Sequence, residues 1–141
     1  MVELGLDYMH AGVLDRAEHL FLELLQQPQP HPEAAKQLMR IYQQEKKWAQ
    51  AIEMGKQIDA SKTAQVKPLI AQFYCELAEQ YTDHDRHEAF NMLKQALYHD
   101  ENCVRASLLE ARLFLSIKQP RKALSALQTI EQQNPKFLSE A

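Results

Sequence analysis

An alanine recurs along this chain at nearly constant intervals. Ala17, Ala51, Ala89 and Ala123 stand 34, 38 and 34 residues apart (51 − 17, 89 − 51 and 123 − 89). Sequence periods of this length are typical of stacked helix–turn–helix repeats, because each repeat buries its apolar side only against its neighbours. The period therefore predicts an all-α chain built from about four such repeats.

An aromatic residue precedes each alanine, nine positions earlier in three repeats and eight positions before Ala89. The alanine marks the point where the second helix of a repeat approaches the first, and a larger side chain there would cost ~1–3 kcal/mol through overpacking. The rings are expected to fill the hollow between adjacent repeats. The shorter offset before Ala89 predicts that the third turn, "DHDR", is one residue short. The aromatic residues are Tyr8, Tyr42, Tyr81 and Phe114.

The turns within the repeats also recur. Gly12 stands five residues before its alanine, where a turn needs backbone angles that glycine adopts easily. Lys46 and Lys118 occupy the same place in two other repeats, so those turns are poorer matches. The 38-residue interval carries four extra residues, which we assign to a lengthened start of the fifth helix. Helices are expected near residues 1–11, 14–26, 32–44, 48–59, 66–82, 86–98, 102–116 and 120–133. These features resemble the tetratricopeptide repeat and imply a right-handed α-solenoid.

Length and charge limit the classes of protein to consider. The 141 residues suffice for one domain, and the net charge of −3 gives no positive field to attract nucleic acid or anionic lipid. No apolar run approaches the ~20 residues of a membrane span. Met1 is followed at once by helical pattern, so we interpret the chain as a soluble segment of a longer protein. We predict one domain over residues 1–141, with repeats at roughly 1–30, 31–65, 66–101 and 102–136.

The first helices of the repeats in such a stack line one concave face. Here that face is predicted to be basic, then acidic, then basic with leucines, which suits a protein segment better than a phosphate backbone. A solvated face without a partner is the alternative. Some related repeats hold a C-terminal carboxylate with asparagines, but Leu6 and Arg40 stand at those positions, so no such clamp is expected. The predicted partner-binding residues are Lys36, Arg40, Gln43, Gln44, Gln72, Glu76, Glu79, Arg105, Leu108 and Arg112, and Leu6, Met9, His10, Gln37, Cys75 and Leu115 are also expected to face inward.

An enzyme is the alternative class of function. The string "DHDRHE" places His84 and His87 among carboxylates and could bind a divalent metal, but a polar, exposed turn explains the same composition. Cys75 and Cys103 are too few for a disulfide framework and are expected to be small apolar groups in a reducing compartment. No nucleophile–base arrangement is apparent. We therefore predict no catalytic, metal-binding or cofactor-binding residue.

Four strings together resemble the lipopolysaccharide assembly protein B family, also called LapB or YciM, of Gram-negative bacteria. They are "LDYMHAGVLDRAEHLFLELL", "LMRIYQQEKKWAQAIEMGKQI", "AQFYCELAEQY" and "ARLFLSIKQPRKALSALQTI". The segment "FYCELA" at Phe73–Ala78 carries most weight, because it departs from the general repeat consensus. The resemblance covers nearly the whole chain and implies that it corresponds to the repeat region of that family.

The resemblance implies a regulatory role. Family members have an N-terminal membrane helix, cytoplasmic repeats and a rubredoxin-like zinc module with four cysteines, and the two cysteines of this chain lack the CxxC spacing of that module. The family promotes degradation of the deacetylase LpxC by the membrane protease FtsH and so restrains lipopolysaccharide production. Expected partners are thus these proteins or lipopolysaccharide assembly proteins, at the cytoplasmic face of the inner membrane. A generic peptide-binding module of another assembly complex is the alternative.

Overall fold

The computed structural model describes residues 4–6, 13–27, 32–61 and 66–133. It divides into two compact units, a first unit Met1–Val66 and a second unit Lys67–Ala141. Every regular element in the described ranges is a helix, so the predicted all-α class is confirmed. None of these helices is long and apolar enough to cross a membrane. The single domain over residues 1–141 and its repeat boundaries stay predictions.

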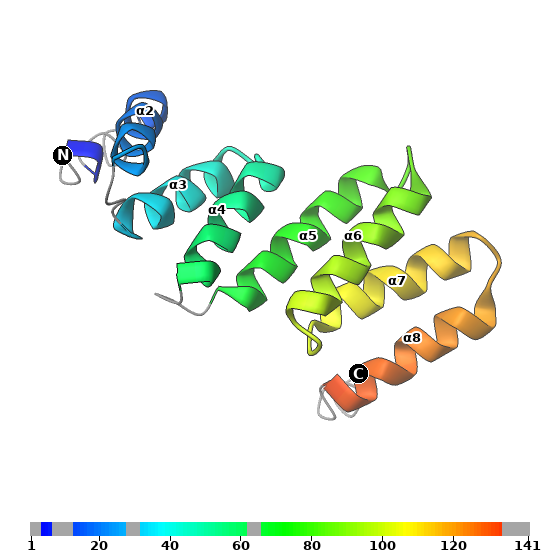
Figure 1. The fold of residues 1–141 in the computed structure, drawn as a ribbon. Helices are drawn as coiled ribbons and strands as arrows, with labels where there is room; N and C mark the ends of the chain where they lie inside the picture. The colour runs from blue at the N-terminus through cyan, green and yellow to red at the C-terminus, as the bar shows by residue number, and fades with distance from the viewer. Residues whose placement is uncertain (1–3, 7–12, 28–31, 62–65, 134–141) are drawn as a thin grey trace. The chain divides into compact units, whose positions relative to one another are not determined.

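The first unit contains α2 (Leu14–Leu25), α3 (Pro32–Gln44) and α4 (Trp48–Ser61). The middle helix, α3, packs against both α2 and α4 (Figure 1). Residues 4–6 are helical, and the rest of the helix predicted at 1–11 lies outside the described residues.

The second unit contains two helix pairs. They are α5 (Lys67–Tyr81) with α6 (Arg86–His99), and α7 (Val104–Ser116) with α8 (Pro120–Gln133). Figure 1 shows α7 beside the first pair, and it packs against both α6 and α5. All seven labelled helices begin and end within two residues of the predicted bounds, which confirms those predictions.

The four recurrent alanines occupy the same place in four helices. Ala17, Ala51, Ala89 and Ala123 are each the fourth residue of α2, α4, α6 and α8. Each donates its amide to the carbonyl four residues earlier, just before the helix begins. Their side chains are at most 2% exposed. The prediction that these alanines lie at buried helix contacts is confirmed.

Two of the turns share one hydrogen-bonded geometry. Lys46 and Lys118 both have a φ of 59°, the left-handed conformation that glycine adopts more easily. After α3, the amide of Lys47 donates to the carbonyl of Tyr42 at 2.8 Å and that of Lys46 to Gln43 at 3.2 Å. The turn after α7 repeats this pair of bonds, which is the Schellman arrangement. The sequence alignment of these lysines with Gly12 therefore found a position of positive φ.

Replacing Lys118 with glycine is expected to stabilise the second unit by about 0.5–1 kcal/mol. Glycine relieves the strain of the left-handed backbone, and part of that gain is lost to the greater freedom of glycine in the unfolded chain. The midpoint of urea unfolding measures the change. Lys118→Ala is the control, because it removes the same charge and keeps the strain. Equal stability of the two variants would contradict the explanation.

The third turn differs from its prediction. Four residues separate α5 from α6, whereas three separate α3 from α4 and α7 from α8, so the prediction of a turn one residue short is wrong. No residue there adopts a positive φ. Instead the amides of His84 and Asp85 both donate to the carbonyl of Tyr81, and the Asp85 carboxylate accepts the amide of Glu88 as the N-cap of α6. A capping aspartate thus replaces the left-handed residue.

The extra residues of the 38-residue interval are not all at the start of the fifth helix. Two of them lengthen α5, which has 15 residues where α3 and α7 have 13. One is in the turn after α5, and one is in the connection before it, because five residues separate α4 from α5 and four separate α6 from α7. The prediction was correct only for the lengthening of the helix.

Two of the predicted inter-repeat rings contact the preceding helix pair. Tyr42 is 5% exposed and donates its hydroxyl to a Glu18 carboxylate oxygen of α2 at 3.2 Å. The Phe114 ring lies 4.7 Å from that of Phe90 of α6. Tyr81 is 37% exposed and is the last residue of its helix, so its assignment to this set was wrong. Tyr8 lies outside the described residues.

Candidate protein-binding face

The ten predicted partner-binding residues fall into both units. On α3 of the first unit, Lys36 is half-buried and Arg40, Gln43 and Gln44 are exposed. Helical spacing places these four on one side of α3. The remaining six belong to α5 and α7 of the second unit, where the geometry is richer, and are Gln72, Glu76, Glu79, Arg105, Leu108 and Arg112.

A polar network joins α5 to α7. The guanidinium of Arg105 donates to a carboxylate oxygen of Glu76 at 2.9 Å and of Glu79 at 3.1 Å. Its other terminal nitrogen donates to the amide oxygen of Gln72 at 3.2 Å. The three acceptors are one and two helical turns apart on α5, so one arginine spans them. Together with Arg112 and its neighbours Leu109 and Leu113, these residues define what we call the α5–α7 face.

The charge of Arg105 is largely balanced within this network. Burial lowers the pKa of Arg105, but the hydrogen bonds and charges of Glu76 and Glu79 outweigh it and leave the pKa above its usual value. Arg105 thus holds two helices together and is less available to a partner than the sequence suggested.

A hollow of about 390 Å³ adjoins this network at the carboxyl-terminal ends of α5 and α7. Leu109 and Leu113 supply apolar lining of the hollow. Arg112 also lines the hollow, and its side chain is exposed. Among the described residues Arg112 makes no ion pair. The remaining lining residues are Glu79, Thr82, Asp83 and Ser116. The hollow therefore combines apolar side chains, carboxylates and an arginine without an ion pair in the part of the chain that the structure describes.

Some residues expected to face a partner are buried instead. Gln37 is 2% exposed, with its amide donating to Glu33 at 2.7 Å, and Cys75 is 0% exposed. Both expectations were wrong, because α3 and α5 each pack on two neighbouring helices and so bury more than one stripe. Leu6 and Leu108 are half-buried, and Leu115 is 58% exposed. Met9 and His10 lie outside the described residues.

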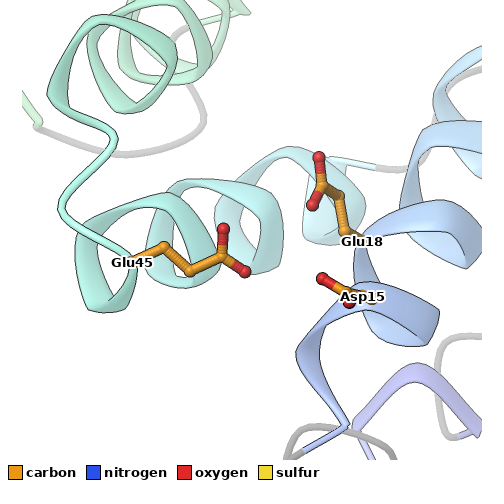
Figure 2. Close-up of side chains that lie close together, drawn as sticks. All are labelled: Asp15, Glu18 and Glu45. Atoms are coloured by element: carbon orange, nitrogen blue, oxygen red, sulfur yellow. The ribbon is translucent and has the colours of Figure 1, made fainter.

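Three carboxylates of the first unit approach one another, which the sequence did not predict. Asp15 and Glu18 of α2 and Glu45 after α3 each place an oxygen within 4.8 Å of the others (Figure 2). Glu18 accepts the Tyr42 hydroxyl, and Glu45 lies 2.7 Å from the Lys47 ammonium. Glu18 and Glu45 thus have partners within the protein, and no bound ion is needed to explain their positions.

Two of these carboxylates shift the pKa values of neighbouring side chains. Burial raises the pKa of Tyr42, and the charge of Glu18 raises it further. The hydrogen bond to Glu45 raises the pKa of Lys47. Asp15 and Glu18 are three residues apart on one helix, but nothing in the sequence places Glu45 beside them.

The string "DHDRHE" forms a turn and a helix start. Asp83, His84, Asp85 and His87 are exposed, and the carboxylate of Asp85 is used as the N-cap of α6. Within the described ranges, the group of three possible ligands close enough to share an ion is the one in the first unit, and neither histidine belongs to it. The role of Asp85 as a helix cap explains why a carboxylate lies in this turn, and no metal is needed to explain it.

Comparison with solved structures and protein families defines the class. Residues 81–141 match the family described as "Tetratricopeptide repeat". The solved structure titled "Crystal structure of MamA" superposes with a TM-score of 0.55 at 19% identity, covering 96% of this chain and 77% of that chain. "MamA 41-end from Desulfovibrio magneticus RS-1" does so with a TM-score of 0.53 at 15% identity, covering 96% and 74%. Such likeness shows the fold alone. The chain is a tetratricopeptide-repeat protein, a class of protein-interaction scaffolds.

Comparison with curated protein sequences identifies more specific relatives within this class of repeat proteins. The chain is 34% identical over 139 residues to "Lipopolysaccharide assembly protein B" of Escherichia coli (strain K12), covering 98% of this chain and 36% of that protein. It is 35% identical over 143 residues to the protein of the same name from Haemophilus influenzae, covering 98% and 35%. The chain is therefore similar to these proteins over nearly its whole length and spans about a third of the length of these curated relatives.

Proposed function

We propose that the α5–α7 face binds a segment of a partner protein, and that the chain acts there as a non-catalytic adaptor. The observation that carries the proposal is the hollow beside Arg112, whose guanidinium makes no ion pair within the described residues and adjoins half-buried Leu109 and buried Leu113. A carboxylate of the partner would pair with Arg112, and a neighbouring apolar side chain would enter the hollow. Arg105 holds the two helices at the spacing that forms this surface.

The partner we propose is the LpxC deacetylase, presented to the FtsH protease for degradation. The relationship to lipopolysaccharide assembly protein B supports a role in lipopolysaccharide biosynthesis. The net charge of −3 favours a protein over nucleic acid or anionic lipid as the bound molecule. In this proposal the chain acts at the cytoplasmic face of the inner membrane and itself holds no cofactor, and a zinc module would belong to the longer protein.

Arg112→Glu is expected to weaken binding of purified LpxC by about tenfold or more, which corresponds to about 1.4 kcal/mol. The substitution replaces the attraction for a partner carboxylate by repulsion. Arg40→Glu makes the same charge change on the predicted surface of α3 in the first unit, and it too is expected to weaken the binding of LpxC. Isothermal titration calorimetry measures the affinity. The free energy of unfolding is expected to change by less than about 0.5 kcal/mol, because both side chains are exposed.

Arg121→Glu is the matched control, since it makes the same charge change at an exposed position of α8. Its affinity should equal that of the unmodified chain. Unchanged binding by Arg112→Glu would show that the α5–α7 face is not the binding surface. Binding of neither LpxC nor FtsH by the unmodified chain would favour the alternative, a peptide-binding module of another assembly complex.

A further inference from the structure

Two cysteines that are 28 residues apart in sequence meet in the second unit. Cys75 lies in the middle of α5, and Cys103 is the residue immediately before α7. Their sulfur atoms are 3.9 Å apart and share a hydrogen bond. Both are free thiols, and their side chains are 0% and 3% exposed. Packing alone requires two small apolar groups and gives no reason for their sulfur atoms to meet.

The surroundings of Cys103 favour its thiolate. It is the N-cap of α7, where the positive end of the helix dipole favours a negative sulfur. Its sulfur accepts the side-chain amide of Gln72 at 3.7 Å. The hydrogen bond with Cys75, the backbone amide of Ala106 and the charge of Arg105 together outweigh burial and the charge of Asp100, and they lower the pKa of Cys103 below that of an ordinary thiol.

Cys75 has the opposite environment. Its hydrogen bond to Cys103 and its burial raise the pKa of its thiol, so Cys75 holds its proton more firmly than an ordinary thiol does. A thiolate beside a protonated thiol is the arrangement in which one sulfur reacts first and the other resolves the product.

We propose that Cys75 and Cys103 form a reversible oxidation site, in which hydrogen peroxide converts the two thiols to an intrachain disulfide that links α5 to the start of α7. Cys103 is the reacting sulfur, because it accepts the side-chain amide of Gln72 and lies at the start of α7. Cys75 is the resolving sulfur.

The chemistry balances in two steps. The Cys103 thiolate attacks one oxygen of the peroxide, the O–O bond breaks, and hydroxide leaves with the proton that the thiol released, as water. Cys103 is then a sulfenic acid. The Cys75 sulfur attacks the sulfur of that acid, its S–H proton goes to the departing hydroxyl group, and a second water leaves. Two thiols are oxidised to one disulfide, and the peroxide is reduced to two waters.

Formation of the disulfide requires the two sulfur atoms to come closer. The sulfur atoms must approach from 3.9 Å to about 2.05 Å. The bond would close a loop that contains α6 and join the two first helices of the helix pairs in this unit. Closing such a loop restricts the unfolded chain and should raise the melting temperature by about 5 °C or more.

The test uses the whole chain, reduced and then treated with hydrogen peroxide. Proteolysis without reduction should yield the Cys75 peptide joined to the Cys103 peptide, and a thiol reductant should separate them. The reaction should be faster at about pH 8 than at about pH 6, because the thiolate of Cys103 is then populated. Free thiols after treatment, disulfides between two chains, or sulfinic acid in place of the disulfide would each overturn the proposal.

Two variants assign the roles of the two sulfurs. Cys75→Ala removes the resolving thiol, so Cys103 should accumulate as a sulfenic acid that a cyclic dione labels. Cys103→Ala should leave Cys75 unmodified under the same treatment. The reverse labelling pattern would refute the assignment. The direct peptide mapping of the unmodified chain decides the proposal even if a variant fails to fold, and the proposal does not depend on the partner of the α5–α7 face.

Discussion

Phe73→Ala is expected to lower the free energy of unfolding of the second unit by about 3–5 kcal/mol. The ring is 1% exposed and lies on α5, the helix that packs against both α6 and α7. Most of the faces of α5 are occupied, since Ile70, Ala71, Tyr74 and Ala78 are also buried. The surrounding helices are therefore held by other contacts and cannot close the cavity that the ring leaves.

Urea unfolding followed by circular dichroism measures this loss. Tyr98→Ala is the matched control, because it also truncates an aromatic ring in the second unit but at a side chain that is 82% exposed. Its stability should stay within about 0.5 kcal/mol of the unmodified chain, as is usual for exposed positions. A similar loss in both variants would show that Phe73 is not a core residue.

Ala89→Leu is expected to destabilise the second unit by about 1–3 kcal/mol through overpacking. The methyl group of Ala89 is 0% exposed in the first turn of α6, where α6 meets α5. A leucine there must push the two helices apart or adopt a strained rotamer. The intrinsic helix propensity of leucine is close to that of alanine, so propensity does not cause the loss.

Gln95→Leu is the control for Ala89→Leu, because it places a leucine on the same helix but away from the contact with α5. Gln95 is exposed on α6, so a leucine there meets no opposing helix. Thermal and urea unfolding should show a stability close to that of the unmodified chain. If Ala89→Leu were as stable as Gln95→Leu, the buried alanine would not set the separation of the helices.

The repeat pattern predicted the helices well because its causes are local. Alanine at a helix contact, proline at the first residue of α8 and a residue of positive φ after α3 each leave a signature within a few positions. The turn after α5 was predicted wrongly because the alignment took Tyr81 as the equivalent of Tyr42. In that turn the amides of His84 and Asp85 donate to the carbonyl of Tyr81, and the Asp85 carboxylate caps the next helix, α6.

The details of the site depend on contacts between distant segments, which one sequence does not reveal. Arg105 and Glu76 were both assigned to the partner-binding face, but their pairing across 29 residues was not predicted. Cys75 and Cys103 were treated as separate apolar groups, although their sulfur atoms are 3.9 Å apart. Helical periodicity gives the side of a helix on which a residue lies and does not give the residue opposite to it.

Nuclear magnetic resonance of leucine methyl groups tests the α5–α7 face most directly. The chain with labelled leucine methyls would be titrated with unlabelled LpxC. Leu109 and Leu113 line the hollow, whereas Leu124 and Leu127 are exposed on α8. We expect the methyl signals of Leu109 and Leu113 to shift or broaden up to saturation while those of Leu124 and Leu127 stay in place. Perturbation of the α8 methyls alone, or of none of the four, would contradict the assignment of the binding surface.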